Sequence, residues 1–301
     1  MKQRPAIVTF YSFKGGVGRT TLLASVAWQL ASKGKRVVAI DLDVEAPGLG
    51  LLLGATGQRG LLDFLADHTA TQSADLTDLL TPARQFGPEA TLVDVVGAGR
   101  LDSDFFEKLA RLDFVGSLVD AAEERPVRDA LRALLKAIAA RTPAPDYILL
   151  DSRAGLHDVS GLSLHDLAHV DVLVGRDSEQ AYQGLELAIE ALGRRRLPAE
   201  LRCVVVQSMA PQDKGSTEHT ESAERYRSRS HDAFVAHVYS KRDDDDPDRD
   251  AEDGAHFPRV CLFQSRLLDF SALRDRRQEL FAEDYVAVAD RIQELCVRED
   301  P

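Results

Sequence analysis

The chain has 301 residues, of which 44% are hydrophobic, and its 49 acidic against 37 basic side chains give a formal net charge of −12. A chain of this length and composition can bury a sizeable core, and its acidic balance argues against an extended surface for nucleic acid or anionic lipid, while local basic patches remain possible. The three cysteines have no paired spacing, which is typical of buried thiols in a reducing cytosol. No apolar stretch approaches the roughly 18 residues of a membrane span and the N-terminus lacks a signal-peptide core, so we expect a soluble, cytoplasmic protein.

A glycine-rich stretch near the N-terminus joins a predicted strand to a predicted helix. The β-branched and aromatic run at 6–11 predicts the strand, and apolar residues at helical spacing from Leu22 to Leu30 predict the helix. The glycines between them let backbone N–H groups converge on an anion, and the helix N-terminus adds its positive dipole end. We therefore expect a phosphate-binding loop with the sequence Phe13-Lys14-Gly15-Gly16-Val17-Gly18-Arg19-Thr20-Thr21.

The rest of the chain alternates between predicted strands and helices. A strand at 36–43 follows the first helix directly, and this strand–helix–strand unit indicates parallel pairing. Further strands are predicted at 91–96, 146–151, 170–175, 201–207 and 259–263, and helices at 103–112, 126–141, 178–192 and 279–297. We expect one α/β domain over 1–301, a doubly wound, mostly parallel sheet of about seven or eight strands with helices on both faces.

The segment 210–256 differs in character from its surroundings and is interpreted as a polar, charged insertion. Its aspartate-rich run at 243–250 predicts a solvated loop, because like charges repel and cannot be buried unpaired. A metal site in this run is the weaker interpretation, since the glycine-turned spacing of calcium loops is missing. The apolar stretch at 233–239 fits either a strand or a helix turn, and periodicity does not decide between them.

The string KGGVGRTT resembles the deviant Walker A motif of the ParA/MinD family of P-loop ATPases, whose pattern is KGGxGK[ST]. Ordered motifs extend the resemblance over residues 6–207. The resemblance implies a P-loop NTPase fold that binds ATP and Mg²⁺. In the loop it assigns nucleotide binding to Lys14, Gly15, Gly16, Val17, Gly18, Arg19, Thr20 and Thr21.

The two basic residues of the loop have different implications. Lys14 matches the family's signature lysine, which reaches across a dimer interface to the partner's nucleotide, so the resemblance implies a homodimer in the ATP state. A mobile ammonium there neutralises charge on the transferred phosphoryl group. Arg19 replaces the family's second lysine. Its guanidinium keeps the charge and can bind two phosphate oxygens, but it is bulkier, so we expect nucleotide binding to survive and hydrolysis to be less secure.

Three aspartates at predicted strand ends match the family's acidic motifs. Asp41 and Asp43 correspond to its DxD, in which Asp43 positions the attacking water and Asp41 lies nearer the metal's outer shell. Carboxylates at i and i+2 point to the same side of a strand. Asp151 matches the Walker B aspartate, which holds Mg²⁺ through water, and Thr20 matches the metal-coordinating hydroxyl. The resemblance thus implies a metal site of Thr20, Asp41, Asp43 and Asp151, with Lys14 and Asp43 as catalytic residues.

Other positions match the family less closely. Gly155 follows Asp151 in a switch-like segment that lacks the family's proline, and we expect it to offer its N–H to the γ-phosphate. Gln207 aligns with an asparagine that binds adenine, and it keeps an amide there. No NKxD or TKxD guanine signature is present, which favours ATP over GTP. After the DxD, the sequence at 44–49 replaces the proline-glutamine-glycine string of partition ATPases, which argues against a literal partition role.

These patterns predict a slow, Mg²⁺-dependent ATPase that acts as a nucleotide-controlled dimerisation switch and engages an unidentified partner protein. One alternative is a regulatory nucleotide-binding module with little hydrolysis in a multi-protein bacterial system, for example in stress or phage defence. Another is an ATP-dependent DNA-binding positioning ATPase, for which the basic clusters at 194–196 and 274–277 are the candidate contacts. The acidic tail at 283–301 argues against membrane anchoring.

Overall fold

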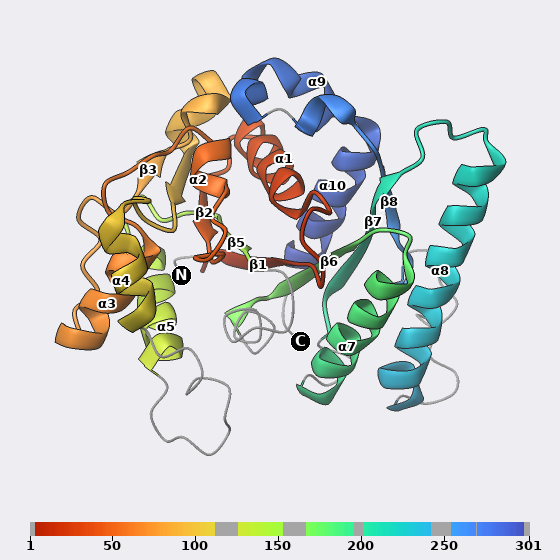
Figure 1. The fold of residues 1–301 in the computed structure, drawn as a ribbon, viewed down its shortest axis with the longest axis horizontal. Helices are drawn as coiled ribbons and strands as arrows, with labels where there is room; N and C mark the ends of the chain where they lie inside the picture. The colour runs from red at the N-terminus through yellow and green to blue at the C-terminus, as the bar shows by residue number, and fades with distance from the viewer. Residues whose placement is uncertain are drawn as a thin grey trace.

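The computed structural model describes residues 4–111, 126–152, 167–195, 201–241, 254–268 and 270–297. They form one eight-stranded sheet in the order β3-β4-β2-β5-β1-β6-β7-β8 (Figure 1). The strands are β1 (Ala6–Tyr11), β2 (Val37–Asp41), β3 (Thr81–Pro82), β4 (Val93–Val96), β5 (Tyr147–Asp151), β6 (Val170–Gly175), β7 (Cys203–Ala210) and β8 (Arg259–Leu262). All neighbours pair in parallel except β3 and β4. The predicted fold class, a mostly parallel doubly wound sheet, is confirmed.

Helices cover both faces of this sheet (Figure 1). The α-helices are α1 (Arg19–Ser32), α2 (Leu49–Leu52), α3 (Leu61–Thr71), α4 (Ser103–Arg111), α5 (Pro126–Ala139), α7 (Glu179–Arg195), α8 (Thr217–His237), α9 (Arg277–Leu280) and α10 (Glu283–Val297). Shorter 3-10 turns are η1 (Arg84–Leu92), η5 (Tyr239–Lys241), η7 (Ser265–Leu268) and η8 (Phe270–Arg276). None of the helices within the described ranges is long and apolar enough to cross a membrane.

The side-chain alternation of the strands separates two layers of core. On one face, strand residues such as Val8, Val172 and Val206 pack against α1 and α10. On the other face, the β2 and β5 side chains pack against α3 and α5, while β7 residues such as Val205 pack against α7 and α8. Strands buried on both faces in this way read as near-continuous apolar runs, as in β5 and β6.

Two predicted segments differ from their expected structure. Within the segment interpreted as a polar insertion, α8 packs beside α7 and buries Tyr226 and Phe234. The ambiguous stretch around 233–237 is therefore helical, and periodicity did not decide it because the residues from 233 to 239 are almost all apolar. The predicted helix at 279–297 is divided into α9 and α10, which begins with Glu283 and Asp284 in its first turn, where negative charge is favourable. The aspartate run at 243–250 lies outside the described residues.

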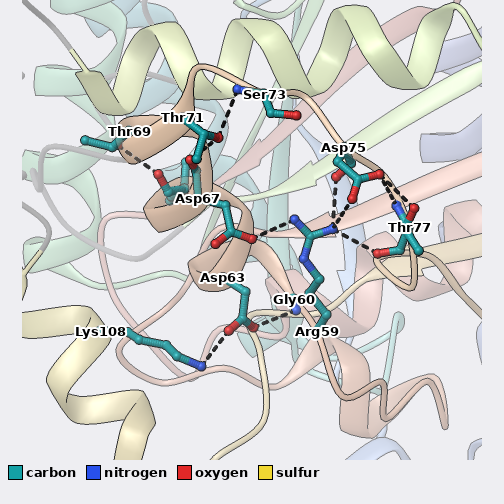
Figure 2. Close-up of polar contacts among 11 residues, drawn as sticks. Arg59, Gly60, Asp63, Asp67, Thr69, Thr71, Ser73, Asp75, Thr77 and Lys108 are labelled. Carbon is teal, nitrogen blue, oxygen red and sulfur yellow. Dashed lines mark hydrogen bonds and ion pairs between the residues drawn. The ribbon is translucent and has the colours of Figure 1, made fainter.

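A polar network holds the segments around α3 (Figure 2). Asp63 accepts a hydrogen bond from the Gly60 N–H at 2.9 Å and an ion pair from Lys108 of α4 at 2.6 Å. Arg59 pairs with Asp67 at 2.8 Å and donates to the Asp75 and Thr77 carbonyls. Every member has a partner inside the network, so we interpret these contacts as structural and expect them to hold α3 to α4 and to the segment 75–77.

Candidate functional site

The glycine-rich loop has the backbone geometry of an anion cradle. Gly16 and Gly18 adopt positive φ angles of 71° and 78°, a region that L side chains rarely occupy. Gly18 is also the N-cap of α1 and supplies no side-chain cap, and the first turn of α1 carries no acidic residue. The orphan N–H groups at this helix N-terminus and its positive dipole end face the loop, which suits a phosphate ligand.

The start of the loop rests on α7. A Cβ atom built on Gly184 would lie 2.0 Å from Cγ of Phe13, so only glycine permits this close approach. The neighbouring Lys14 is half-buried and has no ion pair with another residue in the described part of the chain. None of the described residues therefore keeps its ammonium from a ligand or a second molecule.

Arg19 lies at the centre of the acidic side of the site. Its Nε donates to Oδ1 of Asp151 at 2.6 Å, another guanidinium nitrogen lies 3.5 Å from Oδ2 of Asp43, and a third donates to Oγ of Ser12 at 3.3 Å. The Arg19 side chain is only 8% exposed. Burial alone would lower its pKa, but the charge and hydrogen bond of Asp151, followed by Asp43, raise the pKa above its ordinary value. Arg19 is thus a buried, permanently charged cation between two carboxylates.

Sheet order explains why these distant residues meet. β5 lies between β2 and β1, and Asp41 and Asp151 are paired in the β2–β5 register. The carboxyl ends of β1, β2 and β5 therefore meet at one edge, where ligands of open α/β sheets bind. The structure brings Arg19, Asp43 and Asp151 into contact, as the positions of the motifs in the sequence led us to expect.

Asp41 has a different surrounding from the other two aspartates. Its Oδ2 accepts hydrogen bonds from the N–H groups of Gly48 and Leu49 at 3.1 and 3.0 Å, and its Oδ1 accepts from the Asp43 N–H. Burial, with a further contribution from Asp151, raises the pKa of Asp41 to about 8. In this arrangement Asp41 anchors the N-terminus of α2.

The four predicted metal ligands were tested against this geometry. Thr20 is half-buried in the first turn of α1, beside the loop. Among the described residues, no group of three or more His, Cys, Asp or Glu side chains is arranged to hold a metal ion. Asp43 and Asp151 nevertheless offer the oxygen donors that Mg²⁺ prefers, and Mg²⁺ is usually held by one or two carboxylates together with substrate phosphates. The residues fit a metal that arrives with phosphate oxygens.

Gln207, predicted as an adenine contact, has its side chain directed toward α8. Its Nε2 donates to Oγ of Ser222 on α8 at 2.8 Å, and the Gln207 side chain is fully buried. Strand alternation explains the placement, because Val206 and Ser208 face the α1 side of the sheet and Gln207 faces the opposite side. Gly155, the other predicted contact beyond the loop, lies outside the described residues.

A cavity of about 130 Å³ opens beside the loop on the α1 side. Met209 contributes to its wall with a positive φ of 54°, next to a register irregularity between β7 and β8. Sequence reasoning missed this cavity, because a bulge at the end of β7 leaves no periodic signal. Its lining includes Gly18, Thr21, Ser208, Met209, Phe263 and Tyr285.

Four described arginines of the basic clusters proposed as DNA contacts have acidic or backbone partners. Arg194 pairs with Glu190, and Arg277 pairs with Glu89 at 3.1 Å. Arg274 and Arg276 each donate to a backbone carbonyl, and Arg196 lies outside the described residues. These contacts are typical of solvated surface arginines, and none of them favours nucleic acid.

Comparison of the chain with known proteins identifies its family. The model of the CobQ/CobB/MinD/ParA nucleotide binding domain matches residues 8–250. The chain belongs to this family. Two relatives are the septum site-determining protein MinD of Synechocystis, 30% identical over 175 residues, and MinD of Helicobacter pylori, 30% identical over 168 residues. These matches cover 56% and 55% of this chain and 64% and 50% of the two relatives, so the chain aligns with only about half to two thirds of their length.

Solved structures of family members share the fold over nearly the whole chain. The cell division ATPase MinD of Pyrococcus furiosus matches with a TM-score of 0.60 at 20% identity, covering 96% of this chain and 99% of that one. MinD of Pyrococcus horikoshii, solved in complex with Mg-ADP, matches with a TM-score of 0.58 at 18% identity, covering 98% and 96%. At these identities the likeness establishes the fold, and the predicted ParA/MinD resemblance is confirmed at the level of the family.

Proposed function

We propose that this protein is a Mg²⁺-dependent ATPase that acts as a nucleotide-controlled dimerisation switch and engages a partner protein. The observation that carries the proposal is the pair of cations in one loop with different surroundings. Arg19 is buried between Asp43 and Asp151, whereas Lys14, five positions earlier, has no ion pair with a described residue. Arg19 is placed to bind phosphate inside the site. Lys14 is left to neutralise the negative charge of a ligand or of a second protomer's nucleotide.

Each residue has a proposed task in this function. The loop N–H groups and Arg19 hold the phosphates, and Lys14 neutralises charge on the nucleotide of the second protomer. Thr20, Asp43 and Asp151 would hold Mg²⁺, with Asp41 nearby, and the ion would supply positive charge to offset the negative charge on the phosphate oxygens. Asp43 orients the attacking water. Gly155 remains a proposed phosphate contact.

The cavity beside the loop suits the base of the nucleotide. It adjoins Gly18 and Thr21 at the N-terminal end of α1, and its wall is largely apolar, with Met209 and Phe263 among its residues. Flat ring systems bind well between such side chains. We propose that this cavity takes adenine, while Gln207 supports it from behind by holding the end of β7 to α8.

A regulatory nucleotide-binding module with little hydrolysis is the second candidate, and the contacts of Arg19 favour it. The guanidinium engages both carboxylates that the hydrolytic function needs. A phosphate-release assay separates the two candidates: steady turnover that disappears in Asp43→Ala supports the ATPase, whereas nucleotide binding without turnover supports the module.

The dimerisation switch is tested by light scattering with and without ATP and Mg²⁺. We expect the mass of the wild type to double with ATP and Mg²⁺ and Lys14→Ala to remain monomeric, because the variant lacks the only loop cation that is free to reach a partner among the described residues. Lys33→Ala is the matched control, since Lys33 already pairs with Asp290 at 2.8 Å on the surface. A wild-type mass that does not change with ATP and Mg²⁺, or ATP-dependent dimers of Lys14→Ala, would contradict the proposal.

A further inference from the structure

The carboxylates expected to receive a metal already hold a cation of the chain itself. Arg19 reaches Asp151 through Nε at 2.6 Å and Asp43 through a terminal nitrogen at 3.5 Å. A lysine ammonium is a single point charge, whereas a guanidinium presents donors on several edges of one rigid plane. The arginine at this position can therefore neutralise two separate carboxylates at once.

Burial makes this pairing exclusive. The Arg19 and Asp151 side chains are 8% and 2% exposed, so water screens their charges poorly. A divalent cation entering beside Asp151 would meet the guanidinium at close range, and like charges repel strongly in such surroundings. The two cations consequently compete for the same oxygens.

Phosphate oxygens can resolve the competition. Arginine binds phosphate through two parallel N–H···O bonds, which gives the guanidinium a partner to exchange for Asp151. The added negative charge also offsets the repulsion between the guanidinium and a divalent ion. No described group of three or more potential ligand side chains is arranged to hold a metal without such help.

We propose that Arg19 is an internal counter-cation that excludes divalent metal from Asp43 and Asp151 until nucleotide phosphates bind, so that metal binding is conditional on nucleotide. This inference rests on the proposed nucleotide site and deepens it, because it assigns Arg19 a role in the order of ligand binding.

The chain contains a matched control for this arrangement. Arg59 also faces two aspartates, Asp67 at 2.8 Å and Asp75 at 3.8 Å, as Figure 2 shows. Those two carboxylates are 58% and 56% exposed, so water solvates them when the guanidinium is removed. Removing Arg59 should leave the affinity for a divalent ion unchanged, whereas removing Arg19 should raise it at Asp43 and Asp151.

Equilibrium dialysis against Mn²⁺ tests the inference, with protein-bound Mn²⁺ counted at equal free Mn²⁺ on both sides. Without nucleotide, we expect Arg19→Met to bind Mn²⁺ at least tenfold more tightly than the wild type, and Arg59→Met to match the wild type. With ATP, the wild type should retain one Mn²⁺ per chain. Nucleotide-free wild type that binds Mn²⁺ within about twofold of its affinity in the presence of ATP, or an Arg19→Met variant without the gain, would overturn the inference.

Two further measurements distinguish a failure of this inference from a failure of the proposed function. If Arg19→Met does not fold, Arg19→Lys replaces it, and the wild-type comparison with and without ATP needs no variant. Radiolabelled ATP in the same cells reports nucleotide binding independently. Wild type that retains no ATP contradicts the proposed function, whereas wild type that retains ATP but also binds Mn²⁺ tightly without it contradicts only the role of Arg19.

Discussion

Arg19 differs from a lysine at the same position in the number of directions in which it can donate. Its contacts to Asp151, Asp43 and Ser12 leave from different nitrogens of one plane. For hydrolysis, the carboxylates of Asp43 and Asp151 must orient water and hold the metal. Any carboxylate oxygen that stays paired with Arg19 when nucleotide is bound is not available for either task. Arginine in place of lysine at position 19 should therefore slow ATP turnover more than it weakens ATP binding.

Restoring lysine should accelerate phosphate release. Arg19→Lys keeps one positive charge for the phosphates but frees a carboxylate, so we expect turnover to rise by about tenfold, or about 1.4 kcal/mol in the activation barrier. A malachite-green assay at saturating ATP and Mg²⁺ measures it. Arg59→Lys provides the comparison, because the same chemical change there lies in the α3 network. Turnover of Arg19→Lys equal to or below the wild type would contradict this account of Arg19.

For individual residues, the sequence predicted which charged side chains belong to the candidate site better than it predicted the contacts that they make. The resemblance to the ParA/MinD motifs implied that Arg19, Asp43 and Asp151 would share a site. It did not predict that Asp41 would anchor α2, because the Gly48 and Leu49 N–H groups that Asp41 binds belong to a short helix without periodicity. Gln207 was assigned by alignment to a family position, and the alternation of β7 places its amide on the α8 side.

Helix α7 supports the loop from one side. Phe13 packs so closely over Gly184 that a Cβ there would approach Phe13 to 2.0 Å. Because the peptide after Phe13 carries Lys14, the position of α7 determines where the loop begins. The sequence gives no sign of this contact, since a glycine inside a predicted helix usually indicates only a weak helix position.

Substitution of that glycine should disturb the loop from a distance. We expect Gly184→Ala to lower the free energy of unfolding by about 1–3 kcal/mol through overpacking and to weaken ATP binding, because Phe13 must move. Urea unfolding and ATP titration measure the two effects. Gly215→Ala is the control, as its nearest atom would be 3.4 Å from the new Cβ. Full ATP affinity in Gly184→Ala would show that α7 does not position the loop.

Elements with a strong periodic pattern were predicted well. β1 and β6 have the predicted bounds, and α5 lies within a few residues of its predicted bounds. The interruption between α9 and α10 was not predicted, because Phe281 and Ala282 are themselves compatible with a helix. Close to this interruption, the Leu262 N–H donates a hydrogen bond to Asp284 in the first turn of α10 at 2.7 Å, a long-range contact that local sequence does not indicate.

Over the whole molecule, the order of the sheet converts separate motifs into one site. The loop, Asp43 and Asp151 are far apart in sequence, and they meet because β5 lies between β1 and β2. Strand order follows from long-range pairing, which a single sequence does not reveal, so the family resemblance carried that part of the prediction. The expectation of one domain over 1–301 remains a prediction.

The central claim is that the loop from Lys14 to Thr21 binds ATP through its backbone, and calorimetric titration of ATP tests it most directly. Gly16→Val places a β-branched residue at a φ of 71° and should distort the cradle. Gly34→Val is the matched control, because Gly34 has a φ of 77° and equally open space, but lies beyond the other end of α1. We predict one ATP per chain for the wild type and Gly34→Val, and at least tenfold weaker binding for Gly16→Val. No binding by the wild type, or equal binding by Gly16→Val, would contradict the claim.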